Sequence, residues 1–360
     1  MIERLVLQAY YPHSVTISVP VNILPPELDL VCLGSSLVDV LAQTDDETLS
    51  RLGLIKGTMD LIDLQRAEEI YAEMGQAVEV SGGAAANTAA GVAALGGKSG
   101  FIGKVADDAF GDIFTHDMRA LGVRYQPTPV PAHAGKLEAQ GTGRCLVLVT
   151  PDHERTLNTH LGAATTLSPA DIDGPMVASA SVLYIEGYLF DAPQGPEAVR
   201  EAIRIAHEAG ASVALSLADP LCVERHRREF LDLLVDDLDL VLCNEEEALG
   251  LFNTTSLDDA IEAFDETGLL VAVTLGAKGS VVISPGEISR VDAVSPEQVV
   301  DTTGAGDLFA AGFLYALTHG GSPELAAQLG GLCASEVISH MGPRPQVDLA
   351  QLAREAGLIN

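Results

Sequence analysis

A short segment rich in glycine, Asp301-Thr-Thr-Gly-Ala-Gly-Asp307, holds the residues of this sequence that are best suited to chemistry. An apolar run at 308–317, typical of a buried helix, follows it, and a strand-like run at 297–300 precedes it. Glycines leave the backbone amides uncovered, and the first turn of a helix carries unpaired N–H donors and a partial positive charge. The segment therefore predicts an anion site. Asp307 beside it could accept a proton from a hydroxyl that attacks a bound phosphate, or it could simply cap the helix.

Two further segments place polar groups where an element begins. Ser81-Gly-Gly-Ala-Ala-Ala-Asn87 opens a helix of small residues. Gly82 and Gly83 permit close approach of a ligand, and Asn87 offers both a donor and an acceptor to hydroxyl groups. Asn244-Glu-Glu-Glu247 begins a helix at the end of a strand. Such oxygen atoms suit Mg²⁺, although acids at the start of a helix are also ordinary partners of its dipole.

The elements that must position these residues alternate regularly in the second half of the chain. Strands are predicted at 181–185, 212–217, 238–243, 269–274 and 280–283. Helices are predicted at 196–209, 223–234, 245–252, 258–266 and from Ser322 to about His340. This alternation indicates an α/β fold with a mostly parallel sheet covered on both faces, and ligands then bind beyond the carboxyl ends of the strands.

The first half of the chain is less regular. A buried first strand is predicted at 30–33, residues 42–80 have a mostly helical pattern, and Asp107 is expected to cap the helix that follows it. A hairpin at 144–150 and 155–159 suggests a small β lid over the sheet. Residues 14–19 could add an edge strand or stay mobile. We expect the following organisation: an N-terminal extension at 1–26 and one domain at 27–360, with lid segments at about 40–80 and 125–160.

Composition excludes several classes of protein. The 51 acids and 20 bases give a formal charge of −31, which repels nucleic acid and anionic membranes. This excess of acid fits either adaptation to salt or an ordinary soluble surface. No run of about 18 apolar residues is present, and the first residues lack the pattern of a secretory signal. The five scattered cysteines are expected to be buried thiols, which favours a cytoplasmic location.

The segment 301–307 resembles the second signature of the PfkB, or ribokinase-like, family of carbohydrate and nucleoside kinases, and 81–87 resembles the first. The resemblance runs from about Leu28 to Arg344. It implies a ribokinase-like three-layer sandwich that transfers a phosphoryl group from ATP to a primary hydroxyl. It also implies that Asp307 is the catalytic base, and that an anion hole is formed by the amides of Gly304, Ala305, Gly306 and Asp307.

The same resemblance assigns roles to residues elsewhere in the chain. Asp39 matches an aspartate that binds two sugar hydroxyls, and Glu247 matches a glutamate that helps to hold Mg²⁺ through water. Arg155 has the place of a lid arginine that reaches the transferring phosphate, although it could be an exposed arginine. The expected acceptor site comprises Asp39, Gly82, Gly83 and Asn87. The expected nucleotide site comprises Asn244, Thr274, Gly276, Gly279 and Asp301, where residues 274–279 could equally form a plain turn.

The identity of the acceptor is less strongly indicated. Segments 35–39 and 141–164 are similar to the adenosine kinase branch of the family, which favours the 5′-hydroxyl of a nucleoside, adenosine first. A sugar kinase acting on ribose, fructose or a related sugar is the alternative, and a non-catalytic nucleotide-binding sensor is a third hypothesis. A nucleobase needs an apolar or aromatic wall, for which the candidates are Phe101, Tyr184, Tyr188 and Phe190.

The expected partners follow from the resemblance and from the charge. ATP and Mg²⁺ are the implied cofactors, and a monovalent cation is left open as a further requirement. We expect a small-molecule acceptor, a nucleoside or a sugar, and neither a nucleic-acid nor a membrane partner. Both a monomer and a homodimer are compatible with the sequence.

Overall fold

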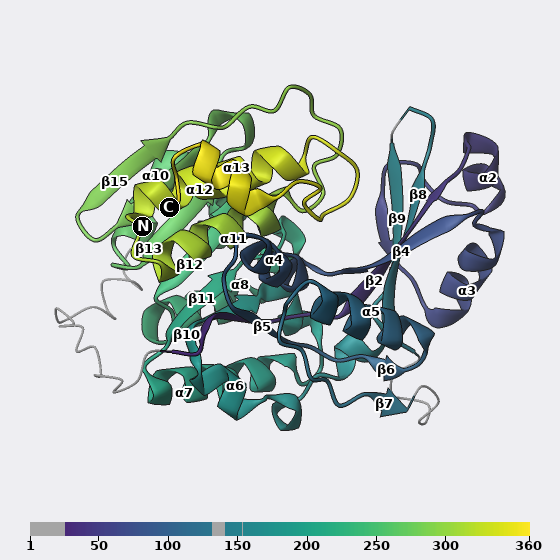
Figure 1. Ribbon diagram of the computed structural model, residues 1–360, viewed down its shortest axis with the longest axis horizontal. Helices are drawn as coiled ribbons and strands as arrows, with labels where there is room; N and C mark the ends of the chain where they lie inside the picture. The colour runs from purple at the N-terminus through teal and green to yellow at the C-terminus, as the bar shows by residue number, and fades with distance from the viewer. Residues whose placement is uncertain (1–25, 132–140, 153) are drawn as a thin grey trace.

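A computed structural model describes residues 26–131, 141–152 and 154–360 of the chain (Figure 1). The strand expected at 14–19 and nearly all of the expected N-terminal extension lie outside the described residues. In the part of the chain that is described, no helix is both long and apolar enough to cross a membrane. All five cysteines are free and buried, as the sequence predicted.

An eight-stranded sheet forms the centre of the molecule, in the order β15-β14-β13-β12-β11-β10-β1-β5. The six strands from β13 to β5 are parallel, and β14 and β15 are antiparallel. The strands are β1 (Leu28–Leu33), β5 (Ser99–Ile102), β10 (Ala180–Glu186), β11 (Ser212–Ser216), β12 (Leu240–Asn244), β13 (Leu270–Thr274), β14 (Ser280–Ser284) and β15 (Glu287–Val291). Most of their residues are buried because helices cover both faces of this sheet.

Alternate residues of each central strand join two different hydrophobic clusters. In β1, Leu30 and Cys32 pack on one face, whereas Val31 and Leu33 pack on the other. The first face is covered by α4 (Ala84–Ala94), α11 (Ala305–Thr318) and α12 (Pro323–Val337). The second face is covered by α6 (Gly174–Ala178), α7 (Gly195–Ala209), α8 (Pro220–Asp236), α9 (Glu245–Phe252) and α10 (Leu257–Asp265). Figure 1 shows these layers, which confirm the predicted three-layer α/β fold with a mostly parallel sheet.

A second, five-stranded sheet stands at one end of the main sheet, in the order β3-β9-β8-β2-β4 (Figure 1). Its strands are β2 (Leu37–Gln43), β3 (Met59–Leu61), β4 (Ala77–Gly82), β8 (Gly143–Val149) and β9 (Arg155–His160). Strands β8 and β9 form the predicted antiparallel hairpin. On the face away from the main sheet, the helices α2 (Asp46–Arg51) and α3 (Leu64–Glu73) pack on buried side chains of these strands. The opposite face is therefore free to border the carboxyl edge of the main sheet.

Several predicted elements differ from the structure. Residues 297–300 form no strand, and Val299 is exposed. Among the described residues this segment pairs with no strand, and the N–H of Val300 donates instead to the carbonyl of Ile338 at the end of α12, at 2.8 Å. Asp107 was wrongly predicted as a helix cap. It lies in β6 (Ala106–Asp107), which pairs with β7 (Val130–Pro131), and Asp108 caps α5 (Ala109–Ala120) by accepting from the amide of Gly111.

Four further elements were missed: the strands β3, β4 and β15 and the helix α13 (Leu349–Glu355). Residues 42–80 hold the strands β3 and β4 as well as two helices, α2 and α3. Strand β15 follows β14 directly across the two-residue turn 285–286, so its hairpin signal was local and was overlooked. Helix α13 packs on α12 and is only 7 residues long, so its helical pattern is weak.

Candidate active site

Helix α11 begins at the segment where the sequence predicted an anion site. Gly304 is its N-cap with φ +80°, a left-handed conformation that favours glycine, and a side chain there would collide with Pro343 at 2.8 Å. Gly306 is different, because an added Cβ would meet nothing within 4 Å. The start of the helix is therefore firmly placed at Gly304 and open to a ligand at Gly306.

The amides of this first turn differ in their availability. The N–H of Ala305 donates to the carbonyl of Thr302 at 3.2 Å, and the helical ladder begins with Leu308 N–H donating to Gly304 at 2.8 Å. The amides of Gly306 and Asp307 precede that ladder, at the positive end of the helix dipole. Of the four expected anion-hole amides, these two are the best placed to bind an anion.

The carboxylate of Asp307 is held by Asn87 from helix α4. The Nδ2 of Asn87 donates to Oδ2 of Asp307 at 2.8 Å, and the hydroxyl of Thr88 donates to the carbonyl of Asp307 at 3.1 Å. Burial raises the pKa of Asp307 to about 6, although Asn87 and Arg344 both lower it. A carboxylate with a pKa near neutrality is well suited to act as a general base. Asn87 is buried, and its Oδ1 has no partner among the described residues, which leaves an acceptor for a ligand.

Asp39 lies on β2, opposite the turn that joins β4 to α4. An added Cβ on Gly82 would fall 2.4 Å from the carboxyl carbon of Asp39, so glycine at this position makes room for the carboxylate. Gly83 has φ +94°, and a Cβ there would lie 2.3 Å from the carbonyl oxygen of Ser35. Burial raises the pKa of Asp39 to about 6, and the positive charges of Arg344 and Arg155 oppose that effect. The structure thus brings Asp39, Gly82, Gly83 and Asn87 together beside Asp307.

Arg155 and Asp301 meet across the boundary between the two sheets. Arg155, the first residue of β9, places Nη2 2.5 Å from Oδ2 of Asp301 and donates from Nη1 to the hydroxyl of Thr303. The same carboxylate of Asp301 accepts from the amides of Thr303 at 3.0 Å and Gly342 at 2.8 Å. The arginine predicted for the phosphate is therefore tied to the loop that carries the anion site.

Asn244 and Glu247 form a reciprocal cap at the start of α9. The side chain of Asn244 accepts from the amide of Glu247 at 2.9 Å, and Glu247 accepts from the amide of Asn244 at 3.0 Å. Burial raises the pKa of Glu247 to about 7, and the neighbouring charges that act on it are those of Asp219 and Glu246, both negative. A buried carboxylate among acidic neighbours suits a divalent cation, so these residues fit Mg²⁺.

The predicted nucleotide-binding turn follows β13, next to β12. Thr274 pairs with Asn244 across these two strands. Gly276, with φ +59°, has open space around an added Cβ, whereas a Cβ on Gly279 would lie 2.0 Å from the carbonyl of Val291. Gly276 is therefore accessible to a ligand, and the packing of β15 is sufficient to explain Gly279.

A cleft of about 360 Å³ lies beside the turn at Gly82–Gly83, and its lining includes Ser35 and Ala84, which flank Gly83. Its apolar walls come from the second sheet, from the start of α8, and from η1 (Gly162–Thr166), η3 (Gly187–Asp191) and the residues beside them. They consist of Leu37, Met59, Leu61, Leu161, Ala164, Leu189, Ala192 and Leu221. Of the four aromatic candidates, Tyr188 alone lines the cleft. Phe101, Tyr184 and Phe190 are buried in the two cores and do not line this cleft.

Two residues of the site were missed by the sequence. Glu186, the last residue of β10, accepts from the amides of Ser35 at 3.4 Å and Ala85 at 2.9 Å, and burial raises its pKa to about 7. An acid at the carboxyl end of a buried strand was the available signal. Arg344 donates to the carbonyls of Ser81 and Ala86. Its position between two prolines gave no indication of that contact.

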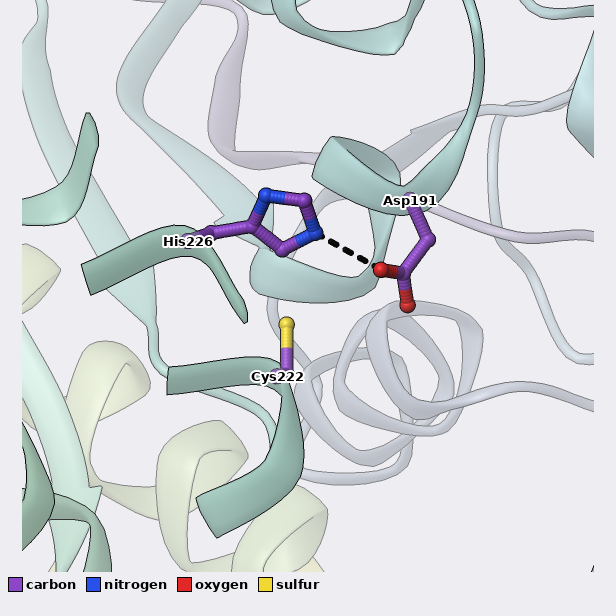
Figure 2. Close-up of side chains that lie close together, drawn as sticks. All are labelled: Asp191, Cys222 and His226. Atoms are coloured by element: carbon purple, nitrogen blue, oxygen red, sulfur yellow. Dashed lines mark hydrogen bonds and ion pairs between the residues drawn. The ribbon is translucent and has the colours of Figure 1, made fainter. Parts of the chain in front are cut away.

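Figure 2 shows Asp191, Cys222 and His226, which lie close together, and Asp191 also lines the cleft. His226 contacts Asp191 at 2.7 Å through Nε2, and Arg225 donates to both oxygens of Asp191 at 2.9 and 2.6 Å. The thiol of Cys222 donates to the carbonyl of Gly187 at 3.4 Å. Since Asp191 is already bound by His226 and Arg225, and Cys222 is bound to the carbonyl of Gly187, we interpret the cluster as a hydrogen-bonded link between η3 and α8.

Comparison with known proteins places this geometry in a family. The sequence pattern of the pfkB family of carbohydrate kinases matches residues 30–349. The chain is 30% identical to adenosine kinase of Saccharomyces cerevisiae over 338 residues, which cover 87% of this chain and 96% of that protein. It is similar in structure to adenosine kinase from Sinorhizobium meliloti, with a TM-score of 0.84 and 49% identity over 92% of this chain and 99% of that one.

A solved structure described as a probable sugar kinase, from Rhizobium etli, is similar to the same extent. It has a TM-score of 0.85 and 45% identity over 93% of this chain and 100% of that chain. Both crystal structures share the large, mostly parallel central sheet with helices on its two faces. The chain therefore belongs to the pfkB family of carbohydrate kinases, has the ribokinase-like fold, and is a phosphotransferase.

Proposed function

We propose that this enzyme uses ATP to phosphorylate the 5′-hydroxyl of a nucleoside, with adenosine as the first acceptor. The observation that carries the proposal is the pairing of Asp307 with Asn87 at the open start of α11. That pairing places the carboxylate of Asp307, which can accept a proton, beside the turn at Gly82–Gly83. We call this turn the acceptor turn, because the substrate that accepts the phosphoryl group would bind there. The same carboxylate lies beside the amides of α11 that are suited to an anion.

Each residue then has a defined task. Asp307 takes the proton from the attacking hydroxyl, and Asn87 holds that carboxylate in place. Asp39 accepts hydrogen bonds from the remaining hydroxyls, and the amides of Gly306 and Asp307 bind the phosphoryl oxygens. Arg155 adds a positive charge at the boundary of the two sheets, and we infer that the sheet carrying it is a lid that excludes water.

ATP and Mg²⁺ have sites that fit them at the carboxyl edge of the main sheet. Bound Mg²⁺ would neutralise charge on the phosphates during transfer. Glu247 and Asp219 would hold it, partly through water, and Asn244 fixes the orientation of Glu247. Thr274 and Gly276 form the turn beside them, where the nucleotide would lie.

The cleft beside Gly83 supports a nucleoside as the acceptor. A free sugar needs hydrogen-bonding groups around most of its surface, whereas a base needs apolar walls. Aliphatic side chains from β2, β3 and η1, together with the ring of Tyr188, supply such walls. The adenosine kinases among the similar proteins agree with this assignment.

A sugar acceptor is the second candidate, and a specific observation favours it. Asp60 and Glu186 line the same cleft with carboxylate oxygens that could accept from sugar hydroxyls. The Rhizobium etli relative described as a probable sugar kinase is as similar in structure as the adenosine kinase. A non-catalytic sensor is the third hypothesis, and any acceptor-dependent phosphoryl transfer would exclude it.

The test is ADP release measured against a panel of nucleosides, ribose, fructose and related sugars, with Mg²⁺ present. We expect kcat/KM for adenosine to exceed that for every free sugar by about a hundredfold or more. The Asp307→Asn protein, prepared identically, measures background hydrolysis of ATP. Turnover of a free hexose without turnover of adenosine would reverse the assignment.

A pair of matched substitutions tests the apolar wall. Leu61 lines the cleft and Val78 lies on β4, and each side chain is 62% exposed, so neither change should prevent folding. Leu61→Asn should raise KM for adenosine about tenfold and leave KM for ATP unchanged, because one wall of the base site becomes polar. Val78→Asn is the control. Equal KM values for adenosine in the two variants would place the base elsewhere.

A further inference from the structure

Arg344 lies in the loop between α12 and α13 and contacts both sides of the acceptor turn. Its Nη2 donates to the carbonyl of Ser81 at 2.9 Å and to the hydroxyl of Ser81 at 3.1 Å, and Nε donates to the same carbonyl at 3.2 Å. Its Nη1 donates to the carbonyl of Ala86 at 2.9 Å. Ser81 precedes Gly82–Gly83, and Ala86 lies in the first turn of α4. One planar guanidinium thus bridges the backbone before and after the two glycines.

The backbone of Ser81 is held from a second direction. Its N–H donates to Oδ2 of Asp117 on α5 at 2.9 Å, while its carbonyl accepts from Arg344. Asp117 also acts electrostatically on Arg344. A lysine could not reproduce this arrangement, because its ammonium group has no planar fork with which to bind two separate carbonyls.

Arg344 also carries charge into the site. Burial lowers the pKa of its guanidinium to about 10, so it remains positive at neutral pH, and the charges of Asp39 and Asp307 act to keep it so. In the described part of the chain, Arg344 is the cation that acts on Asp307, and it also acts on Asp39 together with Arg155. The guanidinium hydrogens, however, bind backbone and Ser81 groups rather than either carboxylate.

We propose that Arg344 is a positioning residue for phosphoryl transfer: its guanidinium fixes the Gly82–Gly83 turn from both sides and supplies a positive charge shared by Asp39 and Asp307. The proposal rests on the function proposed above, because it assigns those two carboxylates to the acceptor and to proton transfer. By fixing the turn, the planar guanidinium determines where the hydroxyl of the substrate lies. Its positive charge keeps the carboxylates of Asp39 and Asp307 ionised at neutral pH.

The groups around both carboxylates determine how the test is read. Asp39 faces the charges of Arg344, Arg155, Asp307 and Asp301. Asp307 faces Asn87 and Arg344, and its own charge reaches Glu186 and Tyr184. Because the site titrates as a coupled group, the acidic limb of kcat/KM against pH reports the site rather than one carboxylate.

Two substitutions separate the effect of the planar guanidinium, which binds the carbonyls of Ser81 and Ala86, from the effect of its positive charge. Arg344→Gln removes the charge, and we expect the acidic limb of its pH profile to shift to a pH about one unit higher. Its activity relative to the parent should therefore be lower at pH 6 than at pH 8. Arg344→Lys keeps the charge, and we expect an unchanged limb with kcat about tenfold lower. Arg119→Gln is the control, since Arg119 also holds a backbone carbonyl, that of Tyr125 at 2.9 Å, and should leave the limb in place.

A second measurement is independent of activity. ¹³C-labelled aspartate carboxyls of the full chain are titrated by NMR without ligand, and the signals of Asp39 and Asp307 are assigned with their Asn variants. Both should titrate near pH 6 in the parent and about one unit higher in Arg344→Gln. If the pKa values of Asp39 and Asp307 did not change in Arg344→Gln, the proposed role of the charge would be wrong. If kcat and KM of Arg344→Lys equalled those of the parent, the proposed role of the planar guanidinium would be wrong. If no substrate were phosphorylated but the two pKa values changed as expected, the proposed function would be wrong. The electrostatic effect of Arg344 on Asp39 and Asp307 would still be confirmed.

Discussion

Asn87 donates a 2.8 Å hydrogen bond to the carboxylate of Asp307, across 220 residues of sequence. The contact joins the first turn of α4 to the first turn of α11 on one face of the main sheet. Those two helices pack closely because Gly91 lies against Ala311 and Leu308. The fold thereby holds the carboxylate of Asp307, the proposed general base, close to the turn at Gly82–Gly83, where we propose that the substrate hydroxyl binds. Such preorganisation is what the proposed catalysis requires.

The contact between Gly82 and Asp39 leads to the first prediction. Gly82→Ala should raise KM for the acceptor at least about tenfold, because the new Cβ would displace the carboxylate of Asp39. Steady-state kinetics with each substrate varied in turn will measure it, and KM for ATP should change less than twofold. Gly75→Ala is the control, since an added Cβ there meets nothing within 4 Å. An acceptor KM unchanged in Gly82→Ala would remove Asp39 from the acceptor site.

The second prediction concerns stability and pH. Burial raises the folded-state pKa of Asp307 from 3.8 to about 6, so its contribution to stability is complete below about pH 4 and is lost as the pH rises to 6. Asp307→Asn removes that loss. Its free energy of unfolding should exceed that of the parent by on the order of 2 kcal/mol above pH 6. Urea denaturation without ligands, between pH 4 and pH 8, measures the difference. If the difference in the free energy of unfolding between the variant and the parent became smaller as the pH rises, the raised pKa of Asp307 would be contradicted.

The third prediction concerns Arg155. Arg155→Ala should lower kcat about a hundredfold, because the anion loop loses its contact with β9 and the site loses a positive charge. Lys56→Ala serves as the control. Lys56 also joins parts of the second sheet region, through ion pairs with Asp46 at 2.8 Å and Asp152 at 2.7 Å. If both variants lost activity equally, Arg155 would act through the stability of the second sheet alone.

The sequence predicted best those features that local chemistry determines. Ser322 caps α12 with Pro323 in its first turn, and α9 spans the predicted 245–252, because capping residues and apolar spacing are local signals. The family resemblance assigned roles to the two glycine segments, and the structure shows the hydrogen bond that joins Asn87 of one to Asp307 of the other.

The remaining features depend on distant parts of the chain. Arg344 reaches Ser81 across 263 residues, and Glu186 reaches Ala85 across 101, so no local pattern could reveal either contact. The run at 297–300 failed as a strand prediction for a related reason. Its two valines are compatible with a strand, but a strand also needs a neighbour to satisfy its backbone hydrogen bonds, and only the fold determines where neighbours lie.

The role of Asp307 as the general base is the central claim, and single-turnover kinetics of Asp307→Asn with ATP, Mg²⁺ and adenosine test it most directly. The control is Asp258→Asn, because Asp258 is exposed on α10 and its side chain is 90% accessible. We expect normal folding and ATP binding in both variants, with phosphoryl transfer reduced about 10²- to 10⁴-fold in Asp307→Asn alone. Transfer within tenfold of the parent in Asp307→Asn would contradict that role.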